Sequence, residues 1–435
     1  MNVRVIGAGL AGCEAAWALA QDGFSVTLVE QKPDRRSPAH RLDTFAELVC
    51  SNSLKAARVD SASGLLKAEM RKMGSLCLAV ADGCAVPAGG ALAVDRFRFT
   101  QGVTEKILSH AGITVLRREE TALDPEQPTI LATGPLTDGA LAEALRALTG
   151  DEALSFYDAA APIVTADSID MEKVSAASRY GRGGDDYLNC FFDKAGYEAF
   201  MRALADAGTA PLHGADADYP VYEGCMPIEK LARRGLDAAR FGPMKPVGLV
   251  DPVTGRRPWA AVQLRREDAA GTMYNLVGFQ TNLRFGEQKR VFSMIPGLEN
   301  AEFARYGVMH RNSFLNSPRV LLPTLSLRAA PNIRIAGQLT GFEGYMESAA
   351  CGQLAARFAA AALRGRTARI PGPDTMCGAL LRYITAPNSD FQPMGANMGI
   401  LPHLAEPVRD KKQRYAALAE RALREMEEYL HEDRD

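Results

Sequence analysis

The first thirty residues constrain the fold of this chain more than any other stretch. A short apolar run at residues 3–6 leads directly into a glycine-rich turn, residues 7–12, with the spacing GxGxxG. A helical pattern follows as far as Asp22, and a second apolar run at residues 26–29 ends at Glu30. This order of strand, glycine turn, helix and strand is typical of a parallel α/β unit that binds a dinucleotide.

Each position of the turn has a physical role in such a unit. Gly7 allows the tight turn, Gly9 lets the backbone approach a pyrophosphate, and Gly12 lets the helix pack closely on the strand. The helix N-terminus offers N–H groups and a partial positive charge to the phosphates. The Glu30 carboxylate is predicted to accept a hydrogen bond from a ribose hydroxyl of the dinucleotide. The predicted cofactor-binding turn consists of Gly7, Ala8, Gly9, Leu10, Ala11 and Gly12.

Length and hydropathy place the chain among globular proteins. With 435 residues, it should form two domains or one large domain with an insertion. Its longest apolar runs, such as residues 358–363, are too short to span a bilayer, so no membrane partner is expected. The N-terminus lacks the successive charged, apolar and cleavage regions of a signal peptide. We therefore expect the protein in the cytoplasm.

The eight cysteines are neither paired as CxxC nor spaced with histidines as zinc ligands, so no metal site is predicted. Most of them are expected to be small buried side chains, and one or two to be reactive thiols. The net charge of −2 argues against broad, non-specific binding to nucleic acid, although a local basic patch stays possible.

Two later segments are expected to return to the cofactor. A strand at residues 129–132 runs into Thr133 and Gly134, and a strand at residues 332–336 runs into a glycine-rich loop that opens a long helix. We predict an α/β fold, with a Rossmann-like, glutathione-reductase-like FAD-binding domain split over residues 1–166 and 305–435. Residues 167–304, where single strands alternate with loops, are predicted to form an inserted α/β domain.

Several longer runs point to one family. Those quoted for the comparison are VIGAGLAGCEAAW, FAELVCSNSL, VPAGGALAVDR, LATGPLT, FYDAAAPIV, EGCMPIE, RFGPMKPVGL, YNLVGFQTNL, IPGLENAEFARYGVMHRNSF and AGQLTGFEGYMESAACG. Together they resemble the TrmFO family of folate- and FAD-dependent tRNA (uracil-5-)-methyltransferases. The resemblance extends to about Gly365. The related GidA/MnmG proteins share some of these runs but are longer.

The resemblance implies a reaction, its cofactors and its partners. A one-carbon unit from 5,10-methylenetetrahydrofolate is reduced to the methyl level with reduced FAD and placed on C5 of the T-loop uridine (U54) of tRNA. NADPH or NADH reduces the flavin again. The partners would be the folate cosubstrate and the T-arm of tRNA.

The resemblance also implies which side chains act. Uracil C5 becomes nucleophilic when a thiolate adds to C6, and two cysteines lie in the family's motifs. Cys225 would be that nucleophile, and Cys50 would remove the C5 proton or protect the one-carbon unit beside the flavin. These roles could be exchanged. The alternative is two inert buried thiols, which their polar or turn-forming neighbours disfavour.

Further residues are implied as binding groups, each with a plain structural alternative. His310 would stack on the folate pterin, or else be a surface or helix-capping histidine. Arg96 and Arg311 would bind anionic groups of folate, flavin or RNA, or else form structural ion pairs. Tyr345 would line the flavin pocket, or else pack in the core. The remaining predicted cofactor contacts are Thr133, Gly134, Gly337, Gln338 and Gly341.

Three rival functions stay open at this point. The same chemistry could act on a ribosomal RNA uridine. The chain could be a GidA-like tRNA modifier, which its length and the EGCMPIE run disfavour. It could also be a flavoprotein that binds RNA without turnover, although binding alone needs no thiol. The sequence leaves the oligomeric state and the preferred reductant undetermined.

Overall fold

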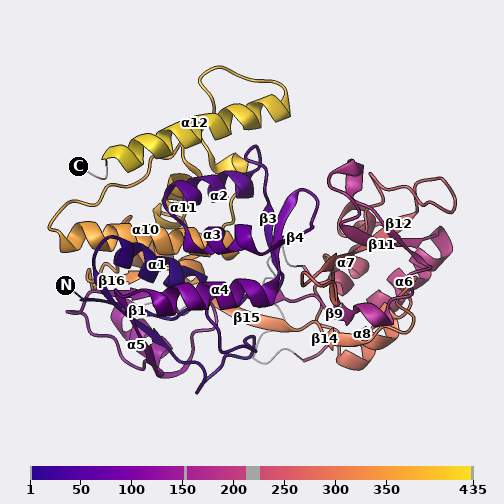
Figure 1. Ribbon diagram of the computed structural model, residues 1–435, viewed down its shortest axis with the longest axis horizontal. Helices are drawn as coiled ribbons and strands as arrows, with labels where there is room; N and C mark the ends of the chain where they lie inside the picture. The colour runs from indigo at the N-terminus through magenta and orange to yellow at the C-terminus, as the bar shows by residue number, and fades with distance from the viewer. Residues whose placement is uncertain (1, 151–153, 212–225, 433–435) are drawn as a thin grey trace.

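The computed structural model describes residues 2–150, 154–211 and 226–432. Figure 1 shows two lobes, and both chain ends lie on the larger one. The larger lobe is built on a five-stranded parallel sheet, and the smaller lobe on a six-stranded antiparallel sheet.

The five-stranded sheet is the α/β core that the sequence predicts. Its middle strands carry apolar residues that are buried on both faces, as expected for a parallel sheet covered by helices. The strands, in spatial order, are β16 (Ile333–Ile335), β7 (Thr129–Leu131), β1 (Asn2–Ile6), β2 (Ser25–Glu30) and β6 (Ile113–Arg117). The predicted Rossmann-like class is therefore confirmed.

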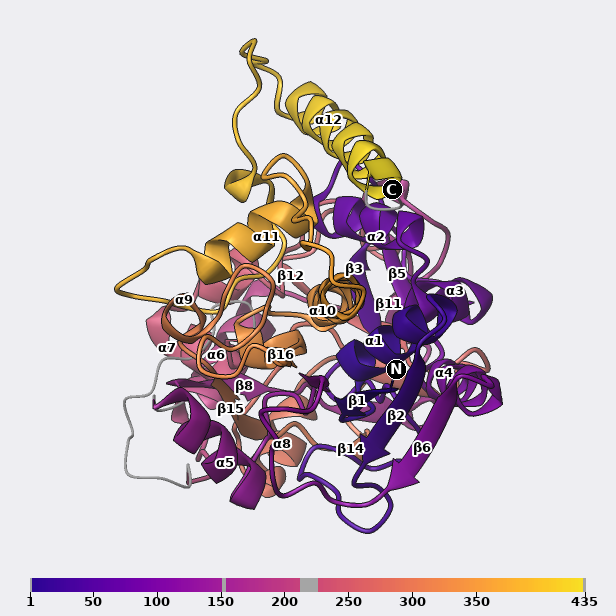
Figure 2. The same ribbon diagram turned by 90° about the vertical axis from the view of Figure 1, so that its left-hand side faces the viewer.

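Two helices on this sheet approach each other closely. These are α1 (Leu10–Gln21) and α10 (Tyr345–Leu363), which lie side by side in Figure 2. A Cβ atom on Gly352 of α10 would lie 2.1 Å from the Ala11 carbonyl oxygen of α1, so only glycine fits there. This close contact sets the spacing between the N-terminal turn of α1 and the middle of α10.

The larger lobe contains further helices and short strands around the five-stranded sheet. Helix α4 begins after Asp95, whose carboxylate accepts hydrogen bonds from the Phe97 and Arg98 N–H groups. These elements are β3 (Ser53–Ala56), α2 (Ala62–Lys72), α3 (Leu76–Gly83), β4 (Ala85–Val86), β5 (Ala91–Val94), α4 (Arg96–Ser109), α5 (Gly139–Thr149), α9 (Ser317–Val320), α11 (Met376–Thr385) and α12 (Lys411–Glu432).

The smaller lobe has its own hydrophobic core. Phe200, Phe279 and Phe292 are fully buried between its sheet and helices, with ring centroids about 6 Å apart. The sheet has the order β10 (Val174–Ala176), β11 (Tyr187–Phe192), β12 (Ala260–Arg266), β13 (Met273–Leu276), β9 (Ile163–Thr165) and β14 (Phe303–Arg305). The helices are α6 (Lys194–Asp206), α7 (Ile228–Arg234) and α8 (Phe285–Phe292).

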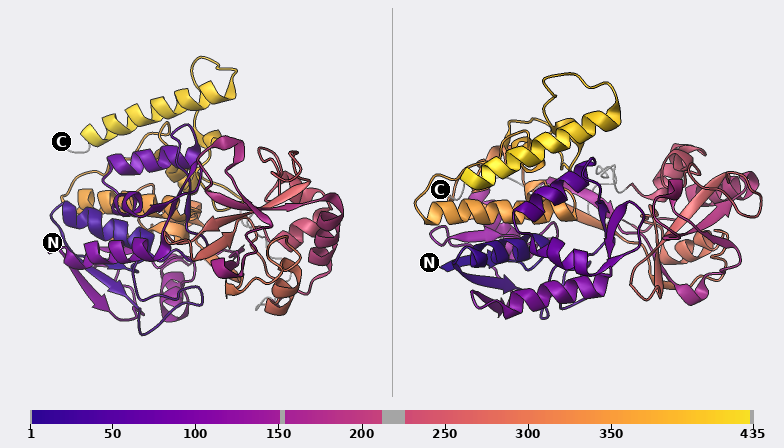
Figure 3. Two further views of the ribbon diagram at one scale, coloured as in Figure 1. Left: turned by 45° about the vertical axis from the view of Figure 1, so that its right-hand side comes forward. Right: turned by 45° about the horizontal axis from the view of Figure 1, so that its top comes forward.

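The chain enters and leaves the smaller lobe along paired strands. Strand β8 (Leu154–Ala159) precedes β9, and β15 (Met309–Phe314) follows β14. The two strands pair antiparallel, with His310 opposite Asp158. Figure 3 shows the smaller lobe beside the larger one from two further directions. Among the described residues, no helix combines the length and apolar character needed to cross a bilayer.

Candidate active site

A cleft in the larger lobe brings together the segments predicted to hold a dinucleotide. It follows the carboxyl ends of β1, β2, β7 and β16, where ligands bind in open α/β sheets. The empty space, counted with its open mouth, is about 1280 Å³. The predicted residues in its lining are Gly7, Ala8, Gly9, Leu10, Ala11, Glu30, Thr133, Gly134, Gly337, Gln338 and Tyr345.

The three glycines of the turn differ in what requires them. Gly7 has φ +96°, and a Cβ there would lie 2.6 Å from the Ala132 carbonyl oxygen. A Cβ on Gly12 would lie 1.8 Å from the Gly7 carbonyl oxygen. On Gly9, by contrast, a Cβ would meet no described atom within 4 Å. The fold itself requires Gly7 and Gly12, and the open side of Gly9 is left for a ligand.

The N-terminus of α1 is suited to bind phosphate. Gly9 occupies the N-cap position, and no described side chain caps the helix there. Leu10 and Ala11, which begin the helix, both line the cleft. N–H groups at a helix N-terminus together with the helix dipole favour an anion. The residues present therefore fit the pyrophosphate of a dinucleotide.

Glu30 closes the turn from the end of β2. Its side chain is buried, and its two carboxylate oxygens accept hydrogen bonds from the Ala8 N–H at 2.8 Å and the Lys32 N–H at 2.9 Å. A carboxylate has about four acceptor positions, so it can accept a ligand hydroxyl in addition. Glu30 thus orders the turn whether or not it also contacts a ribose.

Two predicted residues lie elsewhere than on the cleft surface. Gly12 packs under the turn, as described above. Gly341 has φ +89°, and a Cβ there would lie 2.5 Å from the Phe391 ring. Gly341 therefore permits the turn that follows Gln338, whose side-chain amide donates to Glu343 at 2.5 Å.

The Cys50 thiol lies against Tyr345, beside this cleft. The Tyr345 hydroxyl oxygen accepts hydrogen bonds from the Cys50 N–H at 2.7 Å and the Ser51 N–H at 3.2 Å. It also lies 2.9 Å from the Cys50 sulfur. With two N–H groups donating to this oxygen, the hydroxyl keeps its own proton available for donation to the sulfur.

The protonation of Tyr345 supports this geometry. Burial raises the pKa of its hydroxyl well above the usual range, and the charge of Cys50 raises it further. The hydroxyl is therefore a proton donor at neutral pH and not a base. Tyr345 lines the cleft, so it joins the cofactor region to Cys50.

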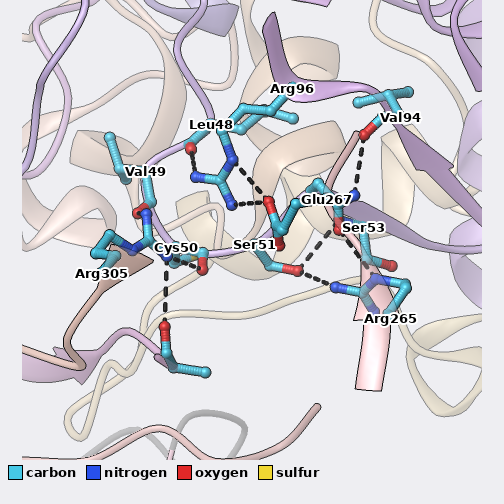
Figure 4. A network of polar contacts seen from close by, with 12 residues as sticks. Leu48, Val49, Cys50, Ser51, Ser53, Val94, Arg96, Arg265, Glu267 and Arg305 are labelled. Carbon is cyan, nitrogen blue, oxygen red and sulfur yellow. Dashed lines mark hydrogen bonds and ion pairs between the residues drawn. The ribbon is translucent and has the colours of Figure 1, made fainter. Parts of the chain in front are cut away.

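Three arginines hold residues 48–52, which we call the Cys50 loop (Figure 4). Arg305 donates to the carbonyl oxygens of Val49 and Cys50, both at 3.0 Å. Arg265 donates to the Ser51 hydroxyl at 2.8 Å and to the Asn52 side-chain oxygen at 2.9 Å. The sequence patterns did not single out these two arginines for the site. Arg265 is one of two consecutive arginines with no other distinguishing pattern, and Arg305 lies inside a run that resembles the TrmFO family.

The third arginine is Arg96, which the sequence marked as a candidate for binding anions or for an ion pair. It is buried and donates to the Leu48 carbonyl oxygen. Its Nη2 atom lies 2.7 Å from a carboxylate oxygen of Glu267, which is also buried. Arg96 thus has the ion pair, and through it the Cys50 loop is joined to the smaller lobe.

The remaining predicted residues are placed less fully. His310 and Arg311 lie on β15, where their backbones pair with Asp158 and Tyr157 of β8. Cys225 lies outside the described residues. Thr133 hydrogen-bonds through its hydroxyl to Thr137 at 2.6 Å. Within the described ranges, no group of three or more histidine, cysteine or acidic side chains could hold a metal ion.

Comparison with known proteins decides the family. A protein of Moorella thermoacetica named methylenetetrahydrofolate–tRNA-(uracil-5-)-methyltransferase TrmFO is 56% identical over 423 residues, which cover 97% of each chain. The chain belongs to the TrmFO family. A second TrmFO, from Heliobacterium modesticaldum, is 53% identical over 434 residues, covering 100% of this chain and 99% of the relative.

Broader comparisons agree with this membership. The family model described as glucose inhibited division protein A matches residues 2–367 of this TrmFO-family chain. Two crystal forms of Aquifex aeolicus GidA superpose with TM-scores of 0.67 and 0.69 at 16% identity. They cover 99% and 98% of this chain and 75% and 76% of GidA. At that identity the likeness shows the shared fold.

Proposed function

We propose that this TrmFO-family chain is a flavin-dependent RNA methyltransferase. Its reaction moves a one-carbon unit from 5,10-methylenetetrahydrofolate to C5 of U54 in the T-loop of tRNA and yields 5-methyluridine, with NADPH or NADH as the source of electrons. The observation that carries the proposal is identity above 50%, over nearly the whole chain, to proteins named for this activity. We expect the enzyme where tRNA is modified, in the cytoplasm.

The cleft is proposed to hold FAD along its length. Gly9 and the N-terminus of α1 would hold the pyrophosphate, and Glu30 the adenosine ribose. Gln338 and Tyr345 line the same cleft where α10 begins, which suits the flavin end. FAD, when bound, supplies the reducing equivalents that bring the one-carbon unit to the methyl level.

The chain itself supplies the thiols. Cys225 is proposed to add to uracil C6, which makes C5 nucleophilic. Cys50 is proposed to remove the C5 proton or to protect the one-carbon unit. The Cys50 thiol is only partly buried and lies 2.9 Å from the Tyr345 hydroxyl oxygen, which supports a reactive thiol over an inert buried one. The exchanged assignment is the alternative.

Folate and RNA are proposed to bind at strand β15, which carries His310 and Arg311. His310 is proposed to stack on the pterin, and Arg311 to bind an anionic group of the folate or the RNA. Both follow β14 in the segment where the chain returns from the smaller lobe to the larger one.

The proposal is tested by product formation. FAD-loaded protein is incubated with methylenetetrahydrofolate, NADPH and either an unmodified tRNA transcript or ribosomal RNA, and 5-methyluridine is measured by mass spectrometry. We expect product on tRNA, none without the folate, and none with Cys225→Ala although FAD stays bound. Product on ribosomal RNA alone would favour the first rival function, and product on neither RNA would exclude a methyltransferase.

A further inference from the structure

The two peptide groups that flank Cys50 are each bonded on both sides. The Val49 and Cys50 carbonyl oxygens accept from Arg305, and the Cys50 and Ser51 N–H groups donate to the Tyr345 hydroxyl. One guanidinium and one hydroxyl thus satisfy all four polar groups of these peptide units. Because these peptide groups are held on both sides, the backbone at Cys50 is fixed in one orientation. The direction of the Cys50 side chain is fixed with it.

The two side chains come from different lobes. Tyr345 begins α10 of the larger lobe, and Arg305 ends β14, an edge strand of the smaller lobe's sheet. A guanidinium has a planar fork of donors that reaches two carbonyl oxygens at once, which a lysine ammonium on a flexible stem does with less geometric control. Arg305 also donates to the Ala161 carbonyl oxygen at 3.4 Å, beside the strand that enters the smaller lobe.

A second set of contacts joins the same loop to the smaller lobe. Arg265 and Glu267 lie at the end of β12 and just beyond it, and they bind Ser51 and Arg96 respectively. The side-chain amide of Asn52 donates to the Arg266 carbonyl oxygen at 2.8 Å. Figure 4 shows Arg96, Arg265 and Glu267 beside the loop. Rotation of the smaller lobe would therefore move the Cys50 backbone.

We propose that Arg305 is a positioning residue that makes the orientation of the Cys50 thiol depend on the seating of the smaller lobe against the larger one. The consequence for catalysis rests on the proposed function of Cys50, whereas the positioning itself does not. Arg305 contacts the loop backbone and not the reacting atoms.

The test is amide hydrogen exchange, measured by mass spectrometry on FAD-loaded protein. Arg305→Gln is expected to speed exchange at Cys50 and Ser51 at least tenfold, because the loop loses both carbonyl anchors. Arg305→Lys, which keeps the charge but not the fork, is expected to lie between. The control is Arg290→Gln, an exposed arginine of the smaller lobe that pairs with Glu287, which should match the unaltered protein.

Several outcomes would overturn the proposal. These are unaltered exchange at Cys50 in Arg305→Gln, wild-type exchange in Arg305→Lys, and equal acceleration in the core of α10, which would indicate general loosening. If Arg305→Gln does not fold, the comparison of Arg305→Lys with Arg290→Gln decides, with at least threefold faster exchange required.

Turnover gives an independent readout. With the proposed activity, Arg305→Lys should lower kcat at least tenfold and leave KM for tRNA within about twofold, because an orientation is lost and not a contact to RNA. If the enzyme makes no 5-methyluridine but exchange changes as expected, the proposed function fails and the positioning role stands. If 5-methyluridine forms and exchange does not change, the positioning role fails alone.

Discussion

At the scale of single residues, the glycine turn separates structural from ligand requirements. Gly12 has no room for a Cβ, because that atom would overlap the Gly7 carbonyl oxygen at 1.8 Å. Gly9 has room, and its φ of −74° is accessible to any residue. The same motif thus contains two glycines that the fold needs, Gly7 and Gly12, and one, Gly9, whose open side is proposed to face the cofactor.

This difference predicts that alanine at Gly12 lowers the stability of the protein, whereas alanine at Gly9 lowers its affinity for FAD. Gly12→Ala should destabilise the apo-protein by about 1–3 kcal/mol, because the added Cβ overpacks the site against the Gly7 backbone. Gly9→Ala should leave apo-protein stability within about 0.5 kcal/mol, yet weaken FAD binding at least tenfold, about 1.4 kcal/mol. Thermal unfolding and flavin titration measure the two effects. Equal loss of stability in both variants would contradict this account, as would unchanged FAD affinity in Gly9→Ala.

At the scale of elements, buried carboxylates hold two helix N-termini in place. Glu14 of α1 accepts from the N–H groups of Leu76 at 3.1 Å and Cys77 at 2.9 Å, at the start of α3. Glu69 of α2 accepts from two N–H groups at the start of α11, at 2.7 and 2.8 Å. Burial raises the pKa of both carboxyl groups to about 7, and these hydrogen bonds offset only part of the cost of burial.

The raised pKa values predict how stability depends on pH. A carboxyl whose pKa is higher in the folded than in the unfolded state, where it is 4.5, stabilises the fold fully below pH 4.5. That contribution is lost as the pH rises through about 7, at up to about 1.4 kcal/mol per unit of pKa difference. The unfolding free energy should therefore fall between pH 5 and 7.5. Glu14→Gln, which stays neutral, should flatten this fall, and an unchanged slope in that variant would contradict the assignment.

At the scale of the whole molecule, the sequence predicted those elements whose signals lie within short stretches of the chain. The glycine turn, the apolar runs of β1 and β2 and the helical spacing of α1 and α10 lie within short windows, and the structure confirms each. The setting of Cys50 could not be read in that way. Arg305 lies 255 positions from Cys50 along the chain, and its role depends on how the smaller lobe docks. No periodicity in the sequence records that docking.

The cleft, the Cys50 loop and the smaller lobe come together at one junction. The cleft proposed to hold FAD and the loop that carries Cys50 meet at Tyr345, and the smaller lobe holds that loop from the other side. One-carbon chemistry at uracil needs a cofactor and a thiol at one place, and under the proposed function this junction is where the two would meet. The source of the methyl carbon is therefore the property to measure.

The most direct test follows one carbon atom. FAD-loaded protein is given 5,10-methylenetetrahydrofolate with a ¹³C-labelled methylene group, NADPH and unmodified tRNA, and the tRNA is digested and mapped by mass spectrometry. The account predicts 5-methyluridine at position 54 with the label in its methyl group. Unlabelled 5-methyluridine, or a labelled modification of a different nucleoside, would contradict it.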